Sequence, residues 1–341
     1  MNKKFYPIII VGSGKAALLH LNAYIKTRDN KKLPQIFIIA GDVIEPEIKD
    51  IVKKYLLYVQ FIDLQQVIEL RQPEAVIDIC TPTATHREII EKMADAGFNR
   101  FLVEKPLVTT ADDLDWIRSK NIHVAIMQNY MFSQATKRTL DLIRTSEIVP
   151  KSMVSIFCKD RIHESIMKRG FKGDEPPHVF TIEIPHQLYL ATEFLGSAKV
   201  EAAYTESMRI NDSVFPSHGT GVIYLEHPSS ISVHFSCLSS YKPIKCVVIS
   251  DNNGRTLTIN YPTSKSVLTS TIEMQGIMGN YRKEVFENDD MMKDALDYYY
   301  TSLTSGASDY ENSRYGSIDD ALTVIEALSK NKSIQSNILS C

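Results

Sequence analysis

Two features of the sequence predict an α/β protein that begins with a doubly wound parallel sheet. Through the first 130 residues, short apolar segments alternate with stretches of helical period. Beyond them, many segments alternate apolar and polar residues, which is typical of strands with one covered face. We therefore expect an N-terminal domain over residues 1–128 with a parallel sheet. A C-terminal α+β domain with a large, mostly antiparallel sheet is expected over residues 129–341.

The apolar segments of the first part are short and rich in β-branched residues, as in strands buried on both faces. Such strands are predicted at 7–11, 35–40, 58–62, 75–80, 101–103 and 123–127. Helices are predicted between them at 15–27, 46–55, 63–70, 85–96 and 111–120. Pro46 suits a first helical turn, Asp63 suits a helix cap, and Gly97 suits the position just after a helix. The short links between these elements place helices on both faces of the sheet.

The second part is predicted to be richer in strands. We expect strands at 153–159, 200–208, 221–225, 231–238, 244–251, 256–261 and 266–272. Helices are expected at 134–144, 179–195, 290–304 and 317–330. The last two helices are expected to pack back onto the N-terminal domain.

Charge and cysteine content narrow the functional classes. Lys and Arg number 38 and Asp and Glu 41, so the net charge of −3 predicts neither nucleic-acid nor membrane binding. Five cysteines without a C-x-x-C pair disfavour a disulfide framework and a Cys-rich zinc site, and we expect no metal. The first apolar run ends at Gly12, too early for a signal peptide, and no run is long enough to span a membrane. We expect a cytoplasmic protein.

The first predicted strand and helix are joined by the loop Gly12-Ser13-Gly14-Lys15-Ala16-Ala17. It reads G-x-G-x-x-A, an accepted form of the dinucleotide-binding fingerprint of the Rossmann fold. Gly12 permits the tight turn, Gly14 lets the backbone approach a pyrophosphate, and Ala17 lets the helix pack on the strand. The helix start supplies N–H donors for phosphate oxygens. The predicted cofactor contacts in this loop are Gly12, Ser13, Gly14, Lys15 and Ala16; the alternative is a glycine-rich turn without a ligand.

The end of the second strand bears on the choice of cofactor. An acidic residue there binds the ribose hydroxyls and disfavours a 2′-phosphate. Asp42 stands near this position, about one residue late, and no Lys or Arg follows within the next five residues. We predict NAD bound with the help of Asp42, with NADP left open. The alternative for Asp42 is a turn residue that caps the next segment.

Two further motifs follow buried strands, at the sheet edge where α/β proteins bind ligands. They are Cys80-Thr81-Pro82-Thr83-Ala84-Thr85-His86 and Glu104-Lys105-Pro106-Leu107. With the glycine loop, their order and spacing resemble the glucose–fructose oxidoreductase / inositol dehydrogenase (Gfo/Idh/MocA) family. The resemblance continues through Asn129-Tyr130-Met131-Phe132-Ser133, residues 182–196 and the closing helices.

The resemblance implies roles for both motifs. Lys105 would contact the cofactor and the substrate hydroxyl, where an ammonium group stabilises charge developing on the reacting oxygen. Glu104 would orient nearby backbone or a cofactor hydroxyl. Without the resemblance, Lys105 is a solvated strand-end lysine and His86 a structural histidine. The further cofactor contacts predicted here are Thr81, Pro82, His86, Glu104, Lys105 and Asn129.

The same resemblance selects His186 as the acid–base residue. The family places a histidine ten residues before the glycine that ends a helix, and Leu195-Gly196 gives His186 that spacing. Histidine suits proton transfer near neutral pH because its ordinary pKa is about 6.5. The family often has Asp where this chain has Ile182, and we predict that Glu183, on the same helical face as His186, orients it instead. A purely structural histidine is the alternative.

The substrate side departs from the family at Met131, where the family often has Arg. The substrate contacts that we predict are Tyr130, Arg161, Lys172 and His186. Lys172 stands in a loop with glycines and prolines that we expect to close over the site. We expect a substrate unlike plain glucose or inositol.

These features together predict an NAD(P)-dependent dehydrogenase or reductase. A hydride would pass between nicotinamide and a secondary alcohol or ketone of a sugar, amino sugar or cyclitol. One alternative keeps the fold but reduces C=N or C=C bonds, or cleaves glycosides with no net redox change. A second alternative is an inactive cofactor-sensing protein. Since family members commonly pair their large sheets, the resemblance also implies a homodimer or homotetramer.

Overall fold

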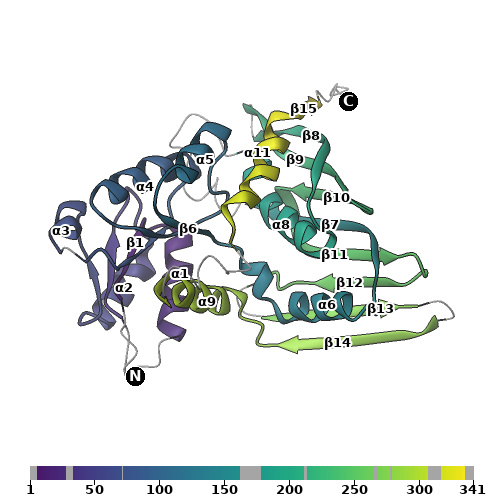
Figure 1. Cartoon of the computed structure of the whole chain (residues 1–341), viewed down its shortest axis with the longest axis horizontal. Helices are drawn as coiled ribbons and strands as arrows, with labels where there is room; N and C mark the ends of the chain where they lie inside the picture. The colour runs from purple at the N-terminus through teal and green to yellow at the C-terminus, as the bar shows by residue number, and fades with distance from the viewer. Residues whose placement is uncertain are drawn as a thin grey trace. The chain divides into compact units, whose positions relative to one another are not determined.

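The computed structural model describes residues 6–27, 34–70, 72–161, 178–210, 213–264, 268–276, 279–305 and 316–334 (Figure 1). They form two units that interleave along the sequence. The first unit is Met1–Asn129 with Met291–Ala321, and the second is Tyr130–Asp290 with Leu322–Cys341. None of the described helices is long and apolar enough to cross a membrane.

The first unit contains a six-stranded parallel sheet with strand order β3-β2-β1-β4-β5-β6. This order is that of a Rossmann fold, which confirms the fold predicted for this part. The strands are β1 (Ile8–Val11), β2 (Ile36–Ile39), β3 (Val59–Phe61), β4 (Val76–Ile79), β5 (Arg100–Val103) and β6 (His123–Ile126). Every residue of the central strands β1 and β4 is buried, so their apolar runs reflect cover on both faces.

Short helices connect these strands. They are α1 (Lys15–Thr27), α2 (Pro46–Lys54), α3 (Leu64–Glu69), the 3₁₀ turn η1 (Thr83–Thr85), α4 (His86–Asp95) and α5 (Ala111–Arg118). Asp63 caps α3 by a reciprocal capping box with Gln66, as the sequence predicted for this aspartate. The helix predicted from residue 85 begins one residue later, because η1 precedes it. Helix α9 (Met291–Ser305) packs against α1, β4 and β5, although it follows them by about 200 residues in sequence.

The second unit contains a nine-stranded sheet with strand order β14-β13-β12-β11-β7-β10-β9-β8-β15. Its strands are β7 (Pro150–Asp160), β8 (Lys199–Ile210), β9 (Ser213–His227), β10 (Ser230–Cys237), β11 (Ser239–Asp251), β12 (Thr256–Asn260), β13 (Thr269–Gln275), β14 (Tyr281–Glu287) and β15 (Asn331–Ile334). Most pairs are antiparallel, as predicted. Two are parallel, β7 with β10 and β15 with β8, so the sheet is mixed.

Several predicted boundaries in this unit were wrong. The strand predicted at 221–225 is the end of the fifteen-residue β9, and strands β14 and β15 were not predicted. The helix predicted at 179–195 is divided into the 3₁₀ turn η4 (Val179–Thr181) and α8 (Ile184–Leu195). The division has a local cause, since Pro185 lies in the first turn of α8 and has no N–H to continue a helix from residue 181.

Helices cover one face of the nine-stranded sheet. Helix α8 lies against β7 and β10, and α6 (Gln134–Arg144) lies against β13, both in front of the sheet in Figure 1. Helix α11 (Ala321–Ser329) precedes β15. Burial alternates along β10, where Ser232, His234 and Ser236 face inward and Ile231 is 43% exposed. The covered face therefore holds polar side chains, and the open face holds apolar ones.

Candidate active site

The glycine loop has the geometry that a dinucleotide requires. Gly12 has φ +112°, and a Cβ there would lie 3.0 Å from the carbonyl oxygen of Cys80. At Gly14 a Cβ would meet nothing within 4 Å, so the space over the loop is open to a ligand. The first N–H groups of α1 have no carbonyl four residues before them within the helix and point toward this space. The loop and helix start, including Lys15 and Ala16, thus fit a pyrophosphate.

Ser13 fastens this loop to the turn after β2. Its hydroxyl donates to the Val43 carbonyl at 2.7 Å and accepts the Gly41 N–H at 3.0 Å, while its own carbonyl accepts from Glu45. The buried Ser13 side chain is therefore engaged in the protein, and its backbone is what the loop can offer a ligand. The exposed Asp42 belongs to the fastened turn, so Ser13 fixes the position of the residue predicted to bind ribose.

His86 joins the two motifs that follow β4 and β5. Its ring nitrogens lie 2.9 Å from the carbonyl oxygens of Leu107 and of Thr81. The ring is fully buried, and burial lowers the pKa of His86 even though these carbonyls favour the charged form. The structure thus places His86 as a bridge between the Thr81-Pro82 and Lys105-Pro106 loops; a direct cofactor contact from His86 stays a prediction.

Lys105 lies at the carboxyl end of β5, where the chain turns through a cis peptide to Pro106. Its backbone N–H donates to Glu104 Oε2 at 3.1 Å. The other carboxylate oxygen, Oε1, lies 3.0 Å from Nε2 of His20, on α1. Glu104 therefore orients backbone, as predicted from the sequence, and a histidine that the sequence analysis did not select holds it.

In the second unit, an acid–base cluster forms around the beginning of α8. The His186 ring lies 4.8 Å from the Tyr130 ring, centroid to centroid. The Tyr130 hydroxyl accepts a hydrogen bond from Nζ of Lys245, on β11, whose ammonium also lies over the tyrosine ring. Burial and the charge of Glu183 raise the pKa of Tyr130 well above its ordinary value, so this phenol stays protonated at neutral pH.

Glu183 is a buried carboxylate between two cations of the same unit. Its Oε1 lies 3.4 Å from Nη2 of Arg161, and its Oε2 lies 4.0 Å from Nζ of Lys245. Its side chain is 6% exposed, so the cations compensate a charge that water hardly reaches. The predicted contact of Glu183 with His186 stays a prediction, whereas its pairing with Arg161 joins two of the predicted site residues.

Helix α8, which carries His186, is tied to the sheet by a buried chain of hydrogen bonds. The chain runs through Gln187, Ser155, His234, Ser232, His227 and the carbonyl of Gly196. Gln187 follows His186 directly, and Gly196 is the residue just after α8. Both ends of the helix are therefore anchored by one network, which restricts the position of His186.

The direction of this chain follows from its last acceptor. The Gly196 carbonyl can only accept, so His227 donates from Nδ1 and accepts from Ser232 at Nε2. Ser232 then accepts from Nε2 of His234, and the Ser155 hydroxyl donates to Nδ1 of His234 at 2.6 Å. The Gln187 amide, 2.6 Å from Ser155, satisfies this order when its nitrogen faces the serine. In the other orientation that nitrogen has no acceptor among the described residues.

Some predicted residues lie elsewhere, and some functional candidates were missed. Lys172 lies outside the described residues, and Asn129 begins the 3₁₀ turn η2 (Asn129–Phe132), in which Met131 is buried. Lys245 was detectable, since it shares strand parity with the buried Val247 and Ile249, as a surface lysine would not. The residues that sequence reasoning missed are His20, Asp78, Ser155, His234 and Lys245.

Residues 7–119 match the model of an oxidoreductase family with an NAD-binding Rossmann fold, GFO_IDH_MocA. A search of curated proteins gave no significant match.

Solved structures resemble nearly the whole chain. KijD10, a 3-ketoreductase from Actinomadura kijaniata in complex with TDP-benzene and NADP, is 13% identical with a TM-score of 0.74, over 97% of this chain and 99% of that one. UDP-N-acetylglucosamine 3-dehydrogenase GnnA from Acidithiobacillus ferrooxidans is 14% identical with a TM-score of 0.68, over 96% and 95%. An oxidoreductase from Agrobacterium radiobacter in complex with NAD⁺, L-tartaric acid and magnesium is 15% identical with a TM-score of 0.70, over 96% and 95%. At these identities the likeness shows the fold.

The glycine loop, the strand order and the family match point to the same cofactor chemistry in the first unit. That unit carries the matched segment, and both units together have the fold of the solved oxidoreductases above. The chain therefore belongs to the Gfo/Idh/MocA family of NAD(P)-dependent oxidoreductases through its Rossmann unit.

Proposed function

We propose that this protein transfers a hydride between nicotinamide and a secondary alcohol or ketone of a sugar, amino sugar or cyclitol. The observation that carries the proposal is the cluster at the beginning of α8. There a histidine, a tyrosine, a lysine and a buried carboxylate lie together on a helix anchored at both ends. A cofactor-binding unit alone needs no such cluster, whereas alcohol oxidation needs a group that takes the hydroxyl proton.

The roles follow from the chemistry of each group. Nicotinamide, when bound, takes up or supplies the hydride. His186 takes the hydroxyl proton during oxidation and returns it during reduction. Lys105 polarises the reacting oxygen, which carries developing negative charge. Tyr130 and Lys245 are proposed as hydrogen-bond donors to substrate hydroxyls, because both stay protonated at neutral pH; the phenol has a raised pKa, and lysine is ordinarily charged there.

The printed names of two structural neighbours support a sugar substrate and suggest a nucleotide-linked one. One is a UDP-N-acetylglucosamine 3-dehydrogenase, and the other was crystallised with TDP-benzene. This chain departs from the wider family at Met131, which is buried where the family often has arginine. A changed substrate side is in keeping with a substrate other than plain glucose or inositol.

We propose NAD as the preferred cofactor and Asp42 as its ribose contact. Asp42 is exposed on the turn that Ser13 fastens to the glycine loop. That turn, over residues 40–45, contains no Lys or Arg to hold a 2′-phosphate.

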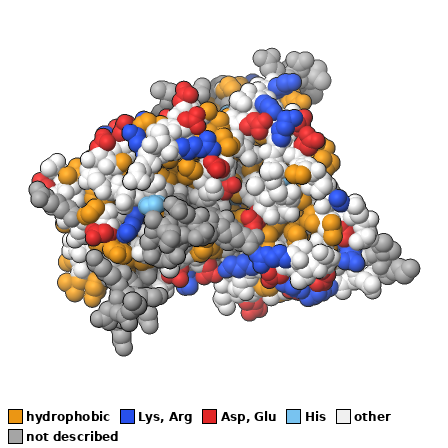
Figure 2. Space-filling view, in the orientation of Figure 1, with side chains coloured by type: hydrophobic (Ala, Val, Ile, Leu, Met, Phe, Trp, Pro, Cys, Tyr) orange, Lys and Arg blue, Asp and Glu red, His pale blue; other side chains and the backbone are white. Residues whose placement is uncertain are grey.

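We further propose that the protein forms a homodimer or homotetramer through the open face of the nine-stranded sheet. The side chains Val154, Tyr204, Tyr224 and Ile231 are 38–43% exposed there. Strand register makes them one patch, since Tyr224 pairs with Val233, which in turn pairs with Val154. Exposed apolar patches of this kind are typical of interfaces. By contrast, acidic and basic side chains are mixed over the face drawn in Figure 2.

The experiment is a titration with NADH and NADPH, followed by a screen of nucleotide-linked sugars, amino sugars and cyclitols. We expect one cofactor to bind tightly and one substrate class to change its absorbance. Lys105→Met and His186→Asn are expected to lower kcat by about 10²–10⁴-fold. Gly12→Val is expected to abolish cofactor binding, because its Cβ would meet the Cys80 carbonyl.

The outcomes separate the competing functions. Release of sugar without a net change in cofactor absorbance would indicate a glycosidase instead. Cofactor binding with no turnover in any assay, unchanged by Lys105→Met, would indicate a cofactor-sensing protein. No binding of either cofactor would refute the oxidoreductase function.

A further inference from the structure

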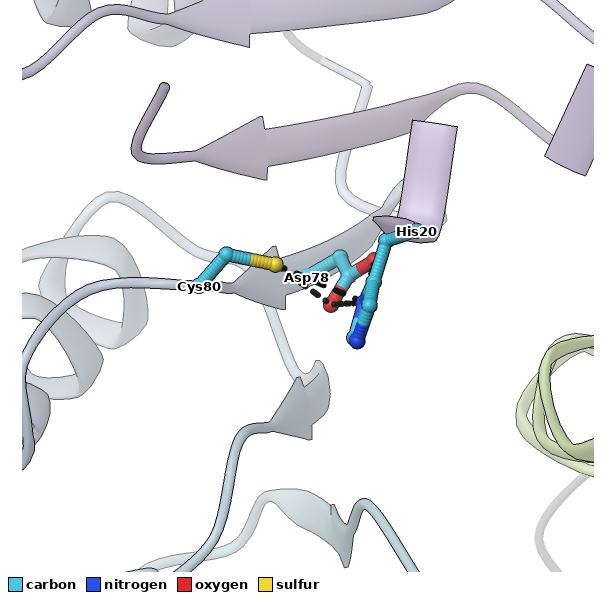
Figure 3. A group of neighbouring side chains, drawn as sticks. All are labelled: His20, Asp78 and Cys80. Carbon is cyan, nitrogen blue, oxygen red and sulfur yellow. Dashed lines mark hydrogen bonds and ion pairs between the residues drawn. The ribbon is translucent and has the colours of Figure 1, made fainter. Parts of the chain in front are cut away.

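A buried histidine connects α1 to the Glu104-Lys105 corner of the first unit. Nδ1 of His20 lies 2.9 Å from Oδ2 of Asp78, on β4, and the two side chains face each other in Figure 3. Nε2 of His20 lies 3.0 Å from Oε1 of Glu104, whose Oε2 accepts the Lys105 N–H at 3.1 Å. A continuous series of contacts thus leads from Asp78 through His20 and Glu104 to the backbone of Lys105.

The partners of His20 determine its protonation. Both ring nitrogens face carboxylate oxygens, which accept hydrogen bonds when ionised, so both nitrogens must donate and the ring is an imidazolium. Burial alone lowers the pKa of His20, but the Asp78 carboxylate outweighs it and raises that pKa well above the ordinary value. The His20 and Asp78 side chains are fully buried and that of Glu104 is 16% exposed, so the attraction acts largely out of water.

The same residues deserve comparison with a metal site, because His20, Asp78 and Cys80 place their ligand-type atoms within 4.8 Å of one another. Burial and the nearby Asp78 carboxylate raise the pKa of Cys80 to about 12, so its thiol keeps its proton and points at Asp78 Oδ1, 3.6 Å away. An imidazolium has no lone pair for a metal ion, and a protonated thiol is a poor ligand. Hydrogen bonding accounts for the whole arrangement.

We infer that His20 is a positioning residue for Lys105: it bridges Asp78 and Glu104 and so fixes the carboxylate that holds the Lys105 backbone. Glu104 makes one bond with each oxygen, one to His20 and one to Lys105, so a rotation of this carboxylate would shift the turn after β5. Without the imidazolium, Asp78 would be a buried carboxylate facing an uncharged partner, and Glu104 would lose its anchor on α1. The effect on turnover rests on the proposed function of Lys105, whereas the charged state of His20 does not.

The first part of the test measures that charged state without any substrate. In ¹⁵N-histidine NMR spectra, the His20 signals are identified as those missing from His20→Gln. We expect both nitrogens to be protonated at about pH 8, where an ordinary histidine with a pKa of about 6.5 is neutral. In Asp78→Asn, which keeps the shape of the side chain, we expect His20 to become neutral at this pH. A neutral His20 in the unchanged protein, or His20 signals that shift on adding Zn²⁺, would overturn the inference.

The second part separates positioning from general stability. His20→Gln is expected to lower kcat by about 10–100-fold, as small misplacements of reacting groups do, with Kd for the cofactor changed less than about 3-fold. His123→Gln, on β6 in the same unit, is the matched control and should leave both constants unchanged. If His20→Gln does not fold, Glu104→Gln tests the same link from its other end.

The outcomes distinguish this inference from the proposed function. An unchanged kcat in folded His20→Gln, together with a large loss in Lys105→Met, would refute the positioning role and leave the proposed function standing. If Lys105→Met also had no effect, the proposed function would fall, and the NMR result would still decide whether His20 is the charged bridge.

Discussion

A buried histidine lies near the centre of each unit, and the two are held by opposite chemistry. In the first unit His20 lies between two carboxylates, and its pKa is raised well above the ordinary value by Asp78. In the second unit His234 lies between the hydroxyls of Ser155 and Ser232, and burial, with a further contribution from His227, lowers its pKa to about 3. One network buries a charge, and the other buries none.

The difference matches what each network supports. A hydroxyl network passes hydrogen bonds in one direction and anchors α8 at both ends without any ion. A charged bridge resists rotation of Glu104 more strongly, because removing one partner leaves an unpaired buried charge. The molecule thus places neutral contacts under the helix that carries His186, and ionic ones behind the turn that carries Lys105.

The largest expected effect on folding comes from breaking the neutral network at its middle. Ser232→Ala leaves His234 without an acceptor and His227 without a donor, so we expect the free energy of unfolding to fall by about 2–3 kcal/mol. The measurement is urea unfolding followed by circular dichroism. Ser236→Ala, two residues along the same inward face of β10, is the matched control. The Ser236 hydroxyl has no hydrogen-bond partner among the described residues, so this change should be nearly neutral. Equal losses in the two variants would contradict the network.

Acid and alkali should separate the two histidines. The pKa of His234 is lowered in the folded protein, so between about pH 6.5 and 4 only the unfolded chain takes up this proton. Its stabilising contribution then falls by about 1.4 kcal/mol per unit as the pH drops. The pKa of His20 is raised, so its contribution is fully present below about pH 6.5 and is lost as the pH rises toward the folded pKa.

Urea unfolding at several pH values tests these opposite signs through differences between variants. The stability difference between the unchanged protein and His234→Gln should shrink on going from pH 6.5 to pH 5. The difference for His20→Gln should shrink on going from pH 6.5 to pH 8. Slopes of the same sign for both variants would show that the two networks do not differ in charge.

The smallest expected effect on chemistry comes from the open face of the second unit's sheet. Tyr224→Glu places a charge in the proposed interface, so we expect the association constant to fall at least tenfold while kcat per subunit changes less than about twofold. Sedimentation over a range of concentrations measures the association. Tyr58→Glu is the matched control, since Tyr58 is equally exposed at 41% but belongs to the first unit. A protein that is monomeric without either change would contradict the interface.

Local patterns carried most of the first unit. Its six strands are short apolar runs separated by amphipathic helices, so burial on both faces was readable from composition. Pairing between distant segments was much less readable. Strand β10 joins β7 in parallel across more than 70 residues, and the short β15 is stabilised by its neighbour β8. No local pattern encodes which of several similar strands lie side by side.

The site shows the same division. Motifs bound to a turn or a helix start, such as the glycine loop, Glu104-Lys105 and His186, could be located because a few neighbouring residues define their geometry. The sequence alone determined the Rossmann fold, the cofactor chemistry and these residues. Only the tertiary structure brought His20 to Asp78, 58 residues away, and to Glu104, 84 residues away, and brought Lys245 to Tyr130. The physical reason is that charges and hydrogen bonds act over a few ångströms in space, whereas sequence patterns record only neighbours along the chain.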